Sequence, residues 1–193
     1  MNDSNKATND YHATLKKELT IAGSVILGAL AVVIMITFFA HNSTPKLTYQ
    51  PANACDLFTP AEAKELLGEN KINSNVSTPV VSGNTATSKC GYTDGNPDVD
   101  NMVVAAVVVR SAVNDKGIEK NKNDFAANKP ANGTVDVNDL GDGAYFNKQL
   151  GQLNVLSGRN WIILSYGVGS APETNTLSSA IQLANKVLHD NEV

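Results

Sequence analysis

The chain has few of the residues on which most active sites are built. Its 193 residues include two cysteines, three histidines and one tryptophan, and no histidine lies between residues 42 and 188. The sequence also lacks a Walker loop, a dinucleotide-binding glycine fingerprint, a CxxC pair and an HExxH helix. We therefore predict no catalytic residues, no metal site and no bound cofactor.

Clusters of basic residues are missing as well. Residues 41–193 carry twelve Lys and Arg against sixteen Asp and Glu. Proteins that bind nucleic acids or anionic membrane surfaces usually present a positive patch. We expect no nucleic-acid partner for this part of the chain.

Charge is absent from residues 19–40, which read LTIAGSVILGALAVVIMITFFA. A helix of this length measures roughly 33 Å, about the thickness of a bilayer core. The alternative is a cleaved signal peptide, but its apolar core is usually about 7–15 residues long and ends in small residues. We expect an uncleaved signal-anchor, a single transmembrane helix whose partner is the lipid bilayer.

The flanks of this apolar segment predict its orientation. Lys16 and Lys17 lie just before it, separated from it only by Glu18, whereas the nearest basic residue after it is Lys46. Because positive charge favours the cytoplasmic side, we expect residues 1–18 to be a cytoplasmic tail and residues 41–193 to lie outside the cell membrane. Residues 41–54 then form a linker, and residues 55–193 are long enough for one extracytoplasmic domain.

Both cysteines fall in the part predicted to be exported. Outside the cytoplasm thiols usually oxidise, so we expect a Cys55–Cys90 disulfide. Closing a loop of roughly 36 residues stabilises a fold by about 3–4 kcal/mol in the chain-entropy model. The alternative is that Cys55 is a reactive thiol at a helix N-terminus, but no histidine is placed to act as its base.

Three segments show helix patterns. Thr59 and Glu62 fit a capping box, and Gly68 fits a helix end. A weaker amphipathic pattern covers residues 115–127, and a strong one covers residues 177–188.

Four segments predict strands: 88–93, 101–110, 152–157 and 160–167, the last two joined by a tight turn. Residues 101–110, NMVVAAVVVR, are apolar on both faces, which is typical of a central strand covered on both sides. We therefore expect an α+β domain in which helices pack on an antiparallel sheet to form a sandwich.

Two acidic stretches invite a calcium interpretation. Read as an EF-hand from Asp94, the first has Val99 in place of the glycine and Ala105 in place of the bidentate glutamate. In the second, residues 135–143, Leu140 falls where an oxygen ligand is needed. We expect a solvated hairpin loop and a turn, respectively.

The order of short motifs resembles a known family. Cys55-Asp-Leu-Phe-Thr-Pro-Ala-Glu-Ala63 is followed by Cys90-Gly-Tyr92, by Asp139-Leu-Gly-Asp-Gly-Ala-Tyr145 and by a C-terminal amphipathic helix. This order is similar to exported domains of unknown function, known mostly from actinobacterial lipoproteins and membrane-anchored proteins. The resemblance implies a PsbP-like sandwich fold with a cysteine pair and no established catalytic residues. In place of the lipidated cysteine of the lipoproteins, this chain has the apolar segment.

These features favour a membrane-anchored, extracytoplasmic binding or interaction domain with an unknown protein or small-molecule ligand. One alternative is a structural or assembly subunit, because Ser24, Gly28 and Ala31 place small residues along one face of the apolar helix. A second alternative, an extracytoplasmic enzyme, would require a pocket with converging titratable groups.

Overall fold

The computed structural model describes residues 47–169 and 172–188, except for the side chains of 72–74, and all of these residues belong to one compact unit, Pro45–Val193. Its elements are, in chain order, α2 (Ala54–Leu57), α3 (Pro60–Leu67), β1 (Ile72–Ser82), β2 (Thr85–Thr93), β3 (Val103–Ala112), α4 (Asp115–Ala127), β4 (Thr134–Val137), β5 (Gly143–Asn147), β6 (Gln152–Ser157), β7 (Asn160–Val168), a 3-10 turn η1 (Pro172–Thr174) and α5 (Leu177–Leu188). The domain is therefore α+β, as predicted.

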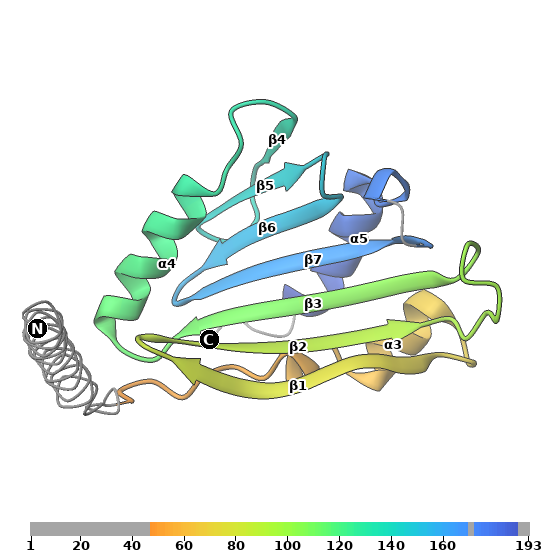
Figure 1. Ribbon diagram of the computed structural model, residues 1–193, viewed down its shortest axis with the longest axis horizontal. Coiled ribbons are helices and arrows are strands. Elements are labelled where there is room, and N and C mark those ends of the chain that lie inside the picture. Colours follow the sequence, from red (N-terminus) through yellow and green to blue (C-terminus); the bar gives the residue numbers. More distant parts are fainter. Residues whose placement is uncertain (1–46, 170–171, 189–193) are drawn as a thin grey trace, which may run out of the picture. The chain divides into compact units, whose positions relative to one another are not determined.

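The seven strands of the described residues form one antiparallel sheet in the order β1-β2-β3-β7-β6-β5-β4 (Figure 1). Strands β1 to β3 form one meander and β4 to β7 another, and α4 connects the two. The meanders join where β3 pairs with β7, so the apolar strand is internal, as predicted. The tight turn at Gly158 is also confirmed, since its φ of 54° is one that glycine adopts readily.

One face of the sheet, the helix-covered face, carries the hydrophobic core. Strand β3 contributes Val107 and Val109, and β7 contributes Ile162 and Leu164, all of them nearly or fully buried. Figure 1 shows α3 and α5 behind the sheet on this side. The helices and the segment between α2 and α3 bury small and medium apolar side chains here: Ala54, Phe58, Ala63, Ala180, Leu183, Ala184 and Val187.

The opposite face, the open face, is covered at one end by α4. Phe125 packs against Tyr145 and Trp161, with ring centroids 5.0 and 6.3 Å apart. Buried Asn121 fixes the helix by donating from Nδ2 to the carbonyl oxygens of Arg110 and Arg159, at 2.9 and 3.0 Å.

Beyond α4, the middle of the open face has no helix on it in the described part of the chain. There the side chains of β3 and β7 are half-buried: Val104, Ala106, Val108, Ile163 and Ser165. The expected sandwich is therefore present on one face only. The reason is that α4, which packs on the sheet through Phe125 and the buried Gly117 and Asn121, lies over one end of the strands.

Residues 48–54 lie on the domain, although the sequence predicted them as linker. The backbone N–H groups of Thr48 and Tyr49 donate to the Val113 carbonyl oxygen at 2.7 and 3.1 Å, and the Ala52 N–H donates to Ser111 Oγ at 3.0 Å. The predicted anchor, residues 19–40, lies outside the described residues. Within residues 47–169 and 172–188, no helix is both long and apolar enough to cross a membrane.

The burial pattern predicts how substitutions divide between the core and the surface. Leu164 is fully buried, so Leu164→Ala should lower the free energy of unfolding by about 2–5 kcal/mol through lost burial and a cavity. Leu150 is 54% exposed, and Leu150→Ala should change it by less than about 0.5 kcal/mol. Urea unfolding of the two variants measures both values. Equal losses would contradict the assigned core.

Candidate functional site

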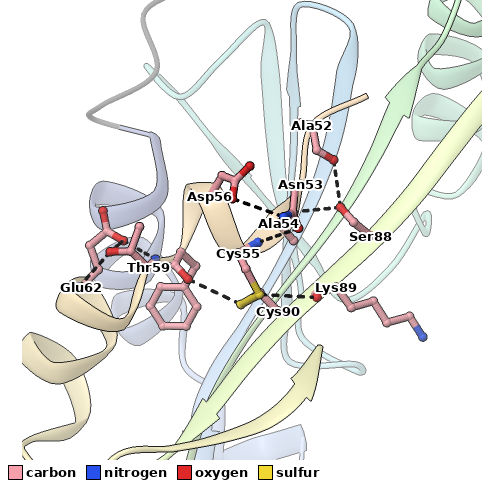
Figure 2. Close-up of a disulfide and its surroundings, with 11 residues drawn as sticks. Ala52, Asn53, Ala54, Cys55, Asp56, Thr59, Glu62, Ser88, Lys89 and Cys90 are labelled. Atoms are coloured by element: carbon pink, nitrogen blue, oxygen red, sulfur yellow. Dashed lines mark hydrogen bonds between the residues drawn. A yellow bond between two sulfur atoms is a disulfide. The ribbon is translucent and has the colours of Figure 1, made fainter. Parts of the chain in front are cut away.

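The structure joins Cys55 and Cys90, the predicted pair, by a disulfide (Figure 2). Cys55 belongs to the four-residue helix α2, and Cys90 belongs to β2, where it is 1% exposed. Their Cα atoms are 5.0 Å apart, within the range that a disulfide requires. The bond ties the first helix of the domain to an inner strand of the sheet.

Hydrogen bonds of Ser88 also fix α2 and the residues before it against β2. Ser88 Oγ, fully buried, accepts from the Ala54 N–H at 2.9 Å and donates to the Ala52 carbonyl oxygen at 3.0 Å. The Asn53 side chain caps α2 by accepting from the Cys55 N–H at 3.3 Å. Figure 2 shows these groups gathered on one side of the disulfide. No local pattern pointed to Ser88, because a serine in a strand is usually exposed.

Between α2 and the predicted helix α3, the chain makes an aromatic contact with the sheet. Phe58 is fully buried and meets Tyr92 edge-to-face, with ring centroids 5.2 Å apart. The capping box of Thr59 and Glu62 is confirmed, and Pro60 occupies the first turn. Burial raises the pKa of the Tyr92 phenol above its ordinary value, with a smaller contribution from the nearby Glu62 carboxylate.

The disulfide, the hydrogen bonds of Ser88 and the contact of Phe58 with Tyr92 all stabilise the fold. Both sulfur atoms are in the disulfide, so neither is a thiolate in this state. In residues 47–169 and 172–188, no three His, Cys, Asp or Glu side chains are grouped as metal ligands. The sequence predicts that none of the three histidines of the chain, His12, His41 and His189, is placed to act as a base for Cys55, and all of them lie outside the described residues.

The first acidic stretch forms a solvated hairpin loop, as predicted. Between β2 and β3, the side chains of Asp94, Asn96 and Asp98 each accept from the backbone N–H two residues ahead, at 3.0, 3.0 and 3.2 Å. This repeated turn chemistry explains the density of oxygen side chains. Val99 at the tip is 63% exposed.

The second stretch divides its acidic side chains among separate structural roles. Asp142 Oδ2 accepts from the Gly158 N–H at 2.6 Å and so braces the β6–β7 turn. Asp136, on the short strand β4, forms an ion pair with Lys129. Asp139 adopts a positive φ of 59°, which completes the turn before β5.

A charged cluster borders the open face where α4 ends its contact with the sheet. Arg110 donates to Asp124 at 2.6 Å and lies over the Trp161 ring, 5.7 Å from its centroid. Hydrogen bonds from Lys120 and then Arg110 hold the pKa of the Asp124 carboxyl below its ordinary value. Trp161 Nε1 donates to Asn154 Oδ1 at 3.1 Å, and the tryptophan is 8% exposed, so its ring is a buried part of the sheet surface beneath α4.

A second contact fixes the incoming chain beside α4. Tyr49 donates to Asp115 at the start of this helix, and its ring lies under Arg159 at 5.2 Å. The hydrogen bond to Asp115 is the largest cause that raises the pKa of the Tyr49 phenol. Sequence analysis missed this contact because Tyr49 is 66 residues from its partner.

Comparisons with known proteins do not identify the chain: no family model, no curated protein and no solved structure matches it. The resemblance to exported actinobacterial domains stays a prediction.

The position of the disulfide predicts its contribution to stability. Replacing both cysteines by serine should lower the free energy of unfolding by about 3–4 kcal/mol, because the unfolded chain loses a crosslink across 35 residues. Guanidinium unfolding with and without a reductant measures the change. Wild-type protein in reductant should unfold at nearly the same denaturant concentration as the serine variant, which itself should not respond to the reductant. Free thiols in oxidised, exported protein would contradict the pairing.

Proposed function

We propose that the protein is a single-pass, membrane-anchored domain that binds a ligand outside the cytoplasm on the open face of its sheet. The observation that carries the proposal is the exposure of β3 and β7. Val108 and Ile163 lie side by side in the pairing of these strands, and both are only half-buried in the described structure. A surface of this kind, apolar in its middle and polar around it, is typical of interaction sites.

The polar surroundings of this surface support recognition rather than simple burial. Lys89 on β2 is exposed and lies opposite Val108 in the strand pairing. Arg110 and Asp124 stand at the α4 end, where their ion pair is partly accessible to solvent. A ligand on the open face would therefore meet apolar contacts at the centre and charged groups at the rim.

The export part of the proposal rests on the sequence and on the disulfide. Residues 19–40 are uncharged and long enough to span a bilayer, and the basic residues before them favour a cytoplasmic N-terminus. A stable disulfide is rare in the cytosol and common outside it. The proposal includes the likeness to exported domains with a PsbP-like fold, which the motifs around Cys55, Cys90 and Asp139 support.

Site-specific photocrosslinking in the membranes of the producing cell tests this proposal. A photoreactive amino acid replaces Val108 or Ile163 in the full chain, and a matched control variant carries it at Glu119, an exposed position on α4. We expect discrete adducts from positions 108 and 163 and none from position 119. The adducts should stay in carbonate-washed membranes and be digested by protease added to the outside of intact spheroplasts.

Two results would contradict different parts of the proposal, the membrane anchor and the ligand-binding face. Recovery of the chain in the soluble fraction, beginning near residue 41, would show that the apolar segment is a cleaved signal. Adducts of equal yield from positions 108, 163 and 119 would show that the open face has no preferred ligand.

A further inference from the structure

The two edges of the described sheet differ in their capacity to pair with another strand. The β4 edge has four residues, and Asp136 there forms an ion pair with Lys129. The β1 edge has eleven residues and no charged residue, and it exposes Val76, Val80 and Val81 by 54, 64 and 41%. Short length and charge protect an edge from strand addition. By these two criteria, β4 is protected and β1 is not.

An irregularity in β1 determines which strand can pair with it. Val76 pairs with Cys90 and Val81 pairs with Ala86, so both valines lie on the helix-covered face. These valines are five residues apart, and regular alternation would place them on opposite faces. They share a face because the register shifts between Ser77 and Val80.

The same shift places two other residues together on the open face. Ser77 pairs with Lys89 and Val80 pairs with Thr87, and both partners point to that face. A straight partner strand keeps strict alternation, so it would match β1 on one side of the shift and mismatch it on the other. A partner must carry the same irregularity at the same place.

A second β1 strand meets this requirement. In an antiparallel pair related by a two-fold axis between Thr78 and Pro79, directly opposed residues share a face on both sides of the axis. The opposed pairs, with the second copy primed, are Asn75 and Ser82′, Val76 and Val81′, and Ser77 and Val80′, each occurring twice. We propose that the protein forms a two-fold dimer by pairing β1 of two copies into a continuous sheet.

The chemistry of the strand agrees with this partner. Val76 and Val81′ form two apolar cross-strand pairs, which stabilise antiparallel strands. The strand is uncharged, so two copies bring no like charges together. Pro79, which lacks a backbone donor, lies beside the axis, where the irregularity already interrupts the hydrogen-bond ladder in both copies.

The expected dimer is reversible, because two paired strands bury less surface than the roughly 1,200 Å² at which stable interfaces begin. The inference concerns an edge of the sheet and does not require the ligand-binding role of the open face. Disproof of the β1 dimer would therefore not affect the proposed ligand binding on the open face, and the reverse also holds.

Sedimentation of the full chain in detergent micelles, up to about 0.5 mM protein, tests the interface. Val76→Glu and Val81→Lys place a charge opposite a valine in both halves, and each should raise the dissociation constant about tenfold or more. The double variant, which combines Val76→Glu with Val81→Lys, places opposite charges across from each other in both halves. It should restore a dissociation constant near that of the wild type. Val99→Lys, at a 63% exposed site in the loop between β2 and β3, is the matched control and should leave the dissociation constant unchanged.

Thermal unfolding of each variant checks the fold, and we expect these exposed substitutions to leave it intact. A wild-type chain that is monomeric throughout the concentration range overturns the proposal. A dimer that persists unchanged in Val76→Glu and Val81→Lys also overturns it, because that dimer would form elsewhere. If the double variant fails to restore association, the two-fold register is wrong.

Discussion

The fold depends on keeping one face of the sheet dry beneath helices that are too short to be stable alone. An isolated helix needs about 12–15 residues to be even marginally stable in water. Helix α2 has four residues and α3 has eight, so both require the sheet and the covalent link to it. The Cys55–Cys90 bond and the buried Ser88 hold α2 on β2, and α3 follows from there. Lys186 of α5 also forms an ion pair with Glu65 of α3, so these two helices contact each other at the surface.

Within residues 47–169 and 172–188, the open face carries a single helix, α4. The contacts of α4 with the sheet combine an aromatic group with a buried amide and an ion pair, and all three lie toward the end of the strands. In the part of the chain that the structure describes, no helix lies on the middle of the open face and no strand lies outside β1. The two surfaces differ in kind, because one offers side chains and the other offers unpaired backbone groups.

Local signals in the sequence predicted the elements that have strong local causes. The capping box at Thr59, the turn at Gly158 and the apolar period of α5 all appear where expected, since each depends on residues close together in the chain. The weaker amphipathic pattern of residues 115–127 also predicted a helix, and the observed bounds of α4, Asp115–Ala127, are those predicted. The cysteine pairing followed from having two cysteines in one predicted compartment.

The remaining features depend on contacts that no local pattern reports. Strand β1, INSNVSTPVVS, was not predicted because its register shift breaks the alternation by which strands are recognised. Tyr49 was assigned to a linker because its partners, Asp115 and Arg159, are distant in the sequence. The apolar residues of β3 predicted helices on both faces of the sheet, because such a sequence is typical of a fully buried strand. On the open face these residues are only half-buried.

The central claim is that the sheet has one dry face and one open face, and β3 tests it most directly. Methyl NMR of the full chain with a soluble gadolinium chelate reports the solvent exposure of each valine. Val107 and Val109 are fully buried, whereas Val104 and Val108 are half-buried on the other face. The account predicts strong attenuation of the methyl signals of Val104 and Val108 and little attenuation of those of Val107 and Val109. Equal protection of all four valines would contradict it, because both faces of the strand would then be covered.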